Sequence, residues 1–278
     1  MRLKSIVCFS VFVLIFTMIA LPVSAHEMWI EVKDLEGEFR VEVFWGHIRD
    51  YLDSASHEDY ELFVRYPDGS VEELETEGIG VQARAFINPR EEGEYVFWAL
   101  RNPGTFTPDG GLTTLSVQLA KSVFQYGSGP GTAAEPVDIL LEIIPEVDLT
   151  DFGTGQFKGA VLMEGTPAES AIISAYGPQN RALEGISDSD GTFQLNLDLP
   201  GIWLIKANVA DEDEGTHNGE DYAMISRTTT LLIDTGSDVE TAASASGSGG
   251  SAGMMVLLLI AGILLGAAAV FLYQSKRA

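Results

Sequence analysis

The sequence predicts an all-β fold: two β-sandwich, immunoglobulin-like domains followed by a single C-terminal transmembrane helix. Three observations predict it. Between residues 26 and 235, apolar and polar residues alternate with the period of two that is typical of half-buried strands. Clusters of Pro, Gly, Asn and Asp interrupt these runs at short intervals. No long helical segments separate the strands, which argues against a parallel βαβ architecture.

Composition and charge narrow the class of function. The chain has 278 residues, of which 41 are Asp or Glu and 16 are Lys or Arg, and its formal net charge is −25. Nucleic-acid binding needs clustered basic residues that neutralise phosphates, so we expect no nucleic-acid partner. An acidic surface instead raises the local concentration of cations and repels anionic substrates.

Residues 1–25 have the layout of a secretory signal peptide. Arg2 and Lys4 precede an apolar run over 6–21, and small residues near Ala25 favour cleavage after that residue. The alternative is an uncleaved N-terminal anchor. The only cysteine of the chain, Cys8, lies in this segment, so a cleaved protein would have neither disulfides nor cysteine metal ligands.

The first predicted domain covers residues 26–150. The best strand pattern is 39–45, and the segments 81–87 and 94–101 flank Asn88-Pro89 as a predicted hairpin. The segment 113–125 is either a short helix or an irregular strand. Further strands are expected at 61–66, before the turn 67–70, and at 137–144.

The second predicted domain covers residues 151–235. About seven short strands over about 80 residues are typical of an immunoglobulin-like sandwich. The expected strands are 157–163, 171–176, 192–197, 203–209 and 222–233, and the acidic segment 211–221 is expected to be a loop.

The C-terminal end predicts a membrane anchor. Residues 236–253 are rich in Ser, Gly and Ala and read as a flexible linker. Residues 254–273 carry no charge and are long enough to cross about 30 Å of hydrocarbon. The basic residues in 274–278 place that tail in the cytoplasm and the body outside, either extracellular or periplasmic. Gly262 and Gly266 form a weak helix-packing motif through which a homodimer is possible.

Several stretches, taken in order, resemble the DUF4198 family. They are 25–29 (Ala-His-Glu-Met-Trp), 46–47 (Gly-His), 118–121 (Gln-Leu-Ala-Lys), 141–145 (Leu-Glu-Ile-Ile-Pro), 164–167 (Glu-Gly-Thr-Pro), 187–191 (Ser-Asp-Ser-Asp-Gly) and 200–203 (Pro-Gly-Ile-Trp). Members of that family are described as periplasmic components of nickel or cobalt uptake. The resemblance therefore implies a metal-binding role beside membrane transporter subunits.

The four histidines are the candidate metal ligands. After cleavage His26 would be the first residue, and its α-amine and ring nitrogen can chelate one ion, a donor set that suits Ni(II), Co(II) or Cu(II). His47 is the natural second ligand, because it ends a strand that can run beside the N-terminal one. His217 lies in the acidic segment 211–221, which is either a weak cation trap or solvated charge. His57 lies in a segment that reads as a polar loop.

Two functions of different class follow from these observations. The first is a membrane-anchored, extracytoplasmic metal-binding protein, accessory to nickel or cobalt uptake, with His26, His47 and His217 as candidate ligands. The alternative is a structural or adhesive cell-surface protein of immunoglobulin-like fold without a metal site. We expect no enzymatic activity, since the sequence has no nucleophile elbow, zinc-protease motif or phosphate-binding loop.

Overall fold

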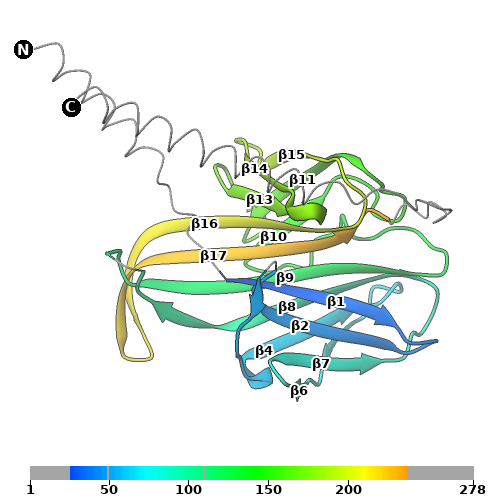
Figure 1. Ribbon diagram of the computed structural model, residues 1–278, viewed down its shortest axis with the longest axis horizontal. Coiled ribbons are helices and arrows are strands. Elements are labelled where there is room, and N and C mark those ends of the chain that lie inside the picture. The colour runs from blue at the N-terminus through cyan, green and yellow to red at the C-terminus, as the bar shows by residue number, and fades with distance from the viewer. Residues whose placement is uncertain (1–25, 49, 109, 237–278) are drawn as a thin grey trace, which may run out of the picture. The chain divides into compact units, whose positions relative to one another are not determined.

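The computed structural model describes residues 26–48, 50–108 and 110–236 of the chain (Figure 1). The prediction of an all-β fold is confirmed for these residues, which form strands and two short 3-10 helices, His57–Asp59 and Pro178–Asn180. The predicted signal peptide and the predicted membrane span at 254–273 lie outside the described residues. Within the described ranges, we find no helix with the length and apolarity that a membrane crossing requires.

A central sheet of eight strands runs through the structure, in the order β14-β13-β16-β17-β9-β8-β4-β5. Figure 1 shows its longest strands, β8, β9, β16 and β17, as neighbouring ribbons. The bounds are β4 Tyr60–Arg65, β5 Val71–Leu74, β8 Gly93–Phe106, β9 Thr114–Tyr126, β13 Ile172–Tyr176, β14 Ala182–Ile186, β16 Ile202–His217 and β17 Glu220–Asp234.

Strands β9 and β17 pair in parallel, from Met224 opposite Thr114 to Leu232 opposite Ser122. All other strand pairs of the described residues are antiparallel. The parallel pair brings strands from both sides of residue 150 into one sheet. The division into two domains, 26–150 and 151–235, stays a prediction, and any such domains share this sheet.

Two smaller sheets accompany the central one. The first has the order β1-β2-β7-β6, with β3 also paired to β2, and the second has the order β10-β11-β12, with β15 paired to β11. The bounds of the first are β1 Glu27–Asp34, β2 Phe39–His47, β3 Tyr51–Leu52, β6 Glu77–Ile79 and β7 Gln82–Ile87. The bounds of the second are β10 Leu141–Pro145, β11 Gly155–Met163, β12 Thr166–Pro167 and β15 Thr192–Leu197.

Each small sheet packs on its own face of the central sheet, which gives two large hydrophobic cores beside a small third cluster of Trp29, Phe44 and Leu204. Strand β8 shows why, because successive side chains of a strand point to opposite faces. Tyr95 and Phe97 contact the core that includes Phe39 of β2, whereas Trp98 contacts the core that includes Phe157 of β11. Burial of these apolar side chains is the main driving force that holds the three layers together.

Of the two alternatives left open for the segment 113–125, the strand is confirmed: Leu119 and Ala120 point into different cores, as strand neighbours do. Two predictions for strands before residue 150 need correction. The strand expected over 137–144 is shorter and begins later, as β10 at Leu141–Pro145. The hairpin expected around Asn88-Pro89 is wrong, since β7 pairs with β2 and β8 pairs with β4 and β9. Its connection instead wraps around Tyr95, whose hydroxyl accepts from the backbone N–H of Arg90 and donates to the carbonyl of Glu91.

Glu42 ties β2 to β7 on the side of the small sheet away from the core. Its carboxylate is 3% exposed and accepts hydrogen bonds from Arg84 Nε (2.9 Å) and Gln82 Nε2 (3.0 Å). Burial raises the pKa of Glu42, but the hydrogen bonds from Arg84 and Gln82 and the charges of Arg84 and Arg40 outweigh it, so the pKa lies below its ordinary value of 4.5.

We expect Glu42→Gln to lower the free energy of unfolding by about 2 kcal/mol near neutral pH, the size of a hydrogen bond to a charged group. Because the folded pKa is lowered, this stabilisation is fully present above the unfolded pKa and is lost as pH falls through the folded value. Urea unfolding of both proteins across the acidic range measures the difference. Glu61→Gln, at an exposed strand position, is the matched control. A deficit for Glu42→Gln that stayed constant down to the lowest pH would contradict the assigned ion pair.

Candidate metal centre

The register of β1 on β2 brings His26 and His47 together. Glu27 lies opposite Gly46, so the preceding residue, His26, lies next to His47, and the two ring centroids are 4.7 Å apart. Gly46 lets the chain turn back into β3: its φ is +145°, and a Cβ there would lie 2.4 Å from the carbonyl oxygen of Tyr51. The expected neighbourhood of His26 and His47 is therefore present in the structure.

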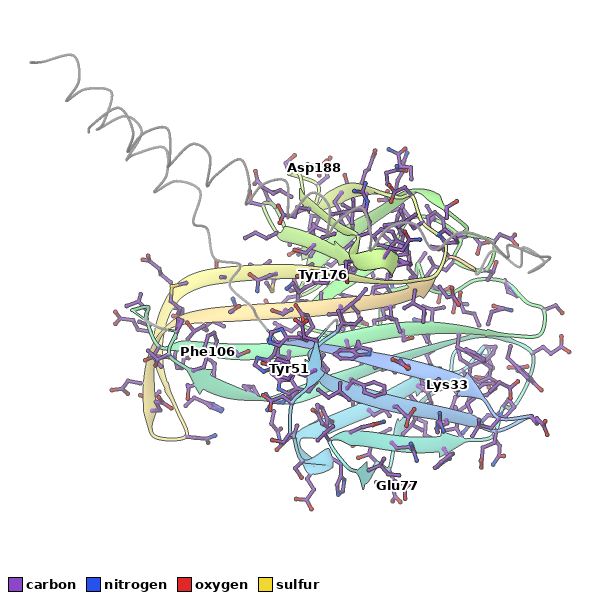
Figure 2. The ribbon with its side chains drawn as sticks, viewed as in Figure 1. Lys33, Tyr51, Glu77, Phe106, Tyr176 and Asp188 are labelled. Atoms are coloured by element: carbon purple, nitrogen blue, oxygen red, sulfur yellow. The ribbon has the colours of Figure 1, made fainter. Side chains whose placement is uncertain are left out.

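Aromatic rings surround the two histidines. His26 stacks on Trp45 with centroids 5.2 Å apart and planes 15° from parallel. The ring of Tyr51 lies 4.9 Å from that of His47, and Figure 2 shows Tyr51 beside the start of β1. The guanidinium of Arg101 lies 4.4 Å from the Trp45 ring centroid. The rings hold His26 at a surface position that solvent reaches, since a third of its side chain is exposed.

A carboxylate fixes the orientation of the His26 ring. Its Nε2 lies 2.9 Å from Asp53 Oδ2. If Nε2 carries the proton and donates to Asp53, Nδ1 has the lone pair, and Nδ1 is the nitrogen that closes a chelate ring with the α-amine of the same residue. A hydrogen bond from the backbone N–H of Ser54, followed by that from His26, holds the pKa of Asp53 below its ordinary value.

A second carboxylate lies beside His47. Glu27 Oε2 is 3.9 Å from His47 Nδ1, and Glu27 Oε1 accepts a hydrogen bond from Lys206 Nζ at 2.9 Å. Lys206 also donates to the hydroxyl of Tyr176 at 3.1 Å. Burial lowers the pKa of Lys206, but the charge and hydrogen bond of Glu27, together with Tyr176, raise it above its ordinary value overall. This buried chain anchors the first residues of β1 to the central sheet.

The side chains near His26 and His47 do not by themselves provide a complete set of metal ligands. Among the residues that the structure describes, no group of three or more His, Cys, Asp or Glu side chains is arranged to hold a metal ion. His26 and His47 offer two imidazoles. A third nitrogen would have to be the α-amine of His26, which exists only if cleavage follows Ala25.

The other two histidines lie elsewhere. His217 is at the tip of the β16–β17 hairpin, where its Nε2 lies 3.0 Å from the carbonyl oxygen of Pro103 and 3.1 Å from Nδ2 of Asn218. The structure therefore does not bring His217 together with His26 and His47. His57 begins a short 3-10 helix, and its ring packs so closely on Gly78 that a Cβ there would lie 2.7 Å from His57 Cδ2.

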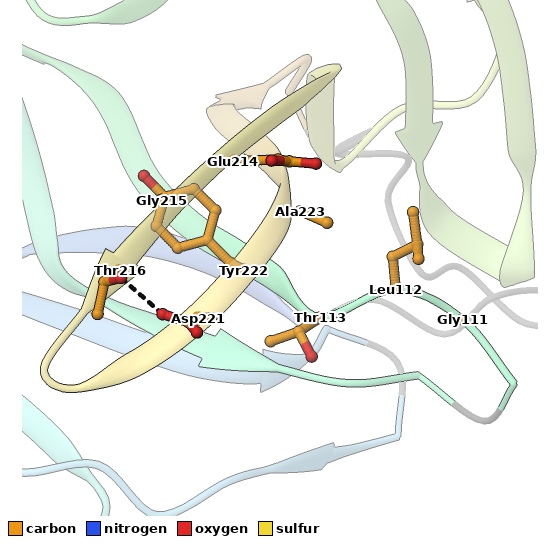
Figure 3. A pocket seen from close by; sticks show the side chains of 9 residues that line it. All are labelled: Gly111, Leu112, Thr113, Glu214, Gly215, Thr216, Asp221, Tyr222 and Ala223. Atoms are coloured by element: carbon orange, nitrogen blue, oxygen red, sulfur yellow. Dashed lines mark hydrogen bonds between the residues drawn. The ribbon is translucent and has the colours of Figure 1, made fainter.

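The acidic segment 211–221, expected as a loop, is instead the continuation of β16 and β17 around a turn at Asn218-Gly219. A hollow of about 620 Å³ lies on this hairpin (Figure 3). Within it, Thr216 Oγ1 donates to Asp221 Oδ1 at 2.6 Å. The residues lining the hollow are 111–113, 214–216 and 221–223. The Asp221 carboxylate bonds within the hairpin, and His217 is not one of the lining residues.

Sequence reasoning missed the residues that support the histidines. Glu27 is adjacent to His26 in the sequence, but the alternation along β1 does not single out its side chain as a partner of the histidines. Lys206 has no local signal, because it is 179 residues from Glu27. Asp53 reaches His26 only because β3 turns back on β2, and a strand of two residues leaves no periodic pattern.

Similar solved structures share little sequence with this chain. A Ca²⁺-stabilised adhesin that helps an Antarctic bacterium bind ice is 11% identical over 76% of this chain and has a TM-score of 0.24; the match covers about half (49%) of the adhesin chain. A two-domain fibronectin type III segment of chicken tenascin is 14% identical over 74% of this chain and 97% of its own, with a TM-score of 0.20. Fibronectin(III)-like modules of Clostridium thermocellum CbhA are 8% identical over 82% of this chain and 98% of their own, also with a TM-score of 0.20.

No curated protein matches the sequence. One family does. Its description is "domain of unknown function", and its sequence model matches residues 23–211, which include β1, β2 and both histidines of the candidate site. The chain therefore belongs to the DUF4198 family.

Proposed function

We propose that this protein binds a divalent late transition metal, Ni(II) or Co(II), with Cu(II) also suited to the donors, and delivers it to membrane transporter subunits. The observation that carries the proposal is the contact of His26 with His47, 4.7 Å between ring centroids. It occurs at the residue that cleavage after Ala25 would make the amino terminus. An α-amine and two imidazoles suit these ions better than Mg²⁺ or Ca²⁺.

The surroundings of the two rings support this function. A metal-bound histidine usually donates its other ring N–H to a carboxylate, which fixes the ring and raises its basicity. Asp53 is placed to do this for His26, and Glu27 lies beside His47. The net charge of −25 adds an attractive field for cations, which salt screens.

The proposed location follows from the two ends of the chain. Residues 1–25 would direct export, residues 254–273 would anchor the protein by a single span, and the basic tail would stay in the cytoplasm. This topology would keep the histidines on the outer side of the membrane that anchors the protein, where a transporter in the same membrane could reach them. A homodimer through Gly262 and Gly266 would place two such sites side by side.

The α-amine is the decisive ligand to test. Mass spectrometry first establishes that the mature protein starts at His26, and its α-amine is then acetylated under conditions that spare lysines. Isothermal titration calorimetry measures the affinity for Ni(II) and Cu(II). Loss of a residue that only supports a ligand costs about 10–100-fold in affinity, and we expect loss of the α-amine, a direct ligand, to cost more. His47→Ala should weaken binding as well.

His57→Ala and His217→Ala are the matched controls, because they remove imidazoles that lie outside the site, and they should bind as the unmodified protein does. Equal affinity of the acetylated and free proteins would rule out the terminal site. A folded protein that starts at His26 and binds none of these metals would instead favour the structural cell-surface alternative.

Asp53 tests the supporting carboxylate. We expect Asp53→Asn to weaken metal binding by about 10–100-fold, because the amide no longer holds a charge against the His26 N–H. Asp50→Asn, just before β3 where Asp53 is just after it, removes the same charge and is expected to change affinity only slightly. Competition titration with a chromophoric chelator measures both. If the two variants lose affinity equally, general attraction by acidic residues, and not the Asp53–His26 contact, explains the effect.

A further inference from the structure

A buried ion pair joins the central sheet to the second small sheet, on the face of the central sheet opposite to β1 and β2. Lys121 of β9 and Glu142 of β10 have side chains that are 0% and 2% exposed, and Lys121 Nζ lies 2.7 Å from Glu142 Oε1. The two residues lie in two of the stretches that resemble the family, 118–121 and 141–145. The proposed metal function does not use either of them.

The hydrogen-bond partners of the pair are fewer than two ions require. A lysine ammonium has three N–H donors. Within the described part of the chain, Lys121 Nζ has two acceptors, Glu142 Oε1 and the carbonyl oxygen of Ala133 at 3.1 Å. On the other side, the backbone N–H of Val137 donates to both oxygens of Glu142, at 3.1 Å each.

Those partners match a secondary amide. Such an amide has one N–H, which would donate to the carbonyl oxygen of Ala133. It has one carbonyl oxygen, which would accept from the backbone N–H of Val137. In a buried ion pair, by contrast, two charges lose their hydration, and their mutual attraction only partly offsets the free energy of this desolvation. Burial lowers the pKa of Lys121 despite the opposing charge of Glu142. Transfer of one proton within the pair gives a neutral amine beside a neutral carboxylic acid.

A third buried carboxyl group binds the same segment that accepts from Lys121. Glu94 of β8 is 1% exposed, and its Oε1 accepts from the backbone N–H and hydroxyl of Thr132, the neighbour of Ala133. Its Oε2 is buried and has no hydrogen-bond partner among the described residues. The charge of Glu94 acts on Lys121 through the protein. Glu94 thus has one buried carboxylate oxygen that is open to a further hydrogen bond.

We propose that Lys121 and Glu142 condense into an intramolecular amide bond. The neutral Nζ attacks Cδ of the protonated Glu142 carboxyl group, so that a C–N bond forms. The Cδ–OH bond breaks, and the hydroxyl leaves as water with one proton from Nζ. Glu94 relays that proton, and the N–H of Val137 stabilises the oxyanion of the intermediate. No oxidant, metal or other reactant is needed.

The bond would close residues 121–142 into a covalent ring that links two layers of the fold. After residue 25 the sequence contains no cysteine, so no disulfide can serve this purpose. Closing a loop reduces the freedom of the unfolded chain and thereby favours the folded state. A protein exposed to proteases outside the cell would benefit from this stabilisation.

Peptide mass spectrometry of the full chain tests the bond. The purified protein is denatured and digested with trypsin, and 102–158 contains Lys121 as its only internal cleavage site. We expect no cleavage after Lys121 and a peptide 102–158 that is lighter than its sequence by one water. A second cut within the ring, after Tyr126, should leave the two pieces joined.

Lys121→Arg is the matched control, because arginine keeps the positive charge and the ion pair but forms no such amide; its peptides should have their full sequence mass. Wild-type peptides that end at Lys121, with no joined species, would overturn the proposal and leave an ion pair alone. This measurement does not depend on whether any variant folds. Glu94→Gln should lower the yield of the joined peptide, and an unchanged yield would overturn the role of Glu94 as the relay.

Discussion

The parallel pairing of β17 with β9 is the constraint on which the rest of this fold depends. Every other pair among the described strands is antiparallel, but this one joins the last described strand to a strand from the first half of the chain. It creates a central sheet with two faces that both need an apolar cover. The two small sheets supply that cover, and the alternation along β8 and β9 sends neighbouring side chains into separate cores.

Buried polar contacts then fix where each layer lies. Lys206 holds Glu27 to the central sheet, and the hydroxyl of Thr230 donates to the carbonyl of Met28 at 2.6 Å. On the opposite face Lys121 meets Glu142. Apolar contacts are non-directional, whereas a buried polar or charged group is costly unless it meets its hydrogen-bond partners. These contacts therefore set the position of β1, and with it the position of His26.

Sequence alone predicts the parts of this structure that depend on local pattern. The strand 39–45 follows from strict alternation, and the neighbourhood of His26 and His47 follows from two consecutive strands that form a hairpin. The pairing of β17 with β9 has no local signal, because its partners are about a hundred residues apart in the chain. The same holds for Lys206 beside Glu27. Local turn chemistry was also misleading at Asn88-Pro89, where the chain crosses between sheets because β7 and β8 have better partners elsewhere.

The long separation between Glu27 and Lys206 has a consequence for the order of assembly. A chain is synthesised from its N-terminus, so His26 and His47 exist early, while Lys206 and Thr230 are added among the last described residues. Until they arrive, the apolar face of the β1–β2 hairpin can already pack, but Glu27 lacks Lys206 and the Met28 carbonyl lacks the Thr230 hydroxyl, so the first residues of β1 are less firmly held. The end of β1 beside His26 therefore gains its last buried contacts only when β16 and β17 have joined the central sheet. Under the proposed function, a finished molecule would hold the metal ion more tightly than an unfinished one.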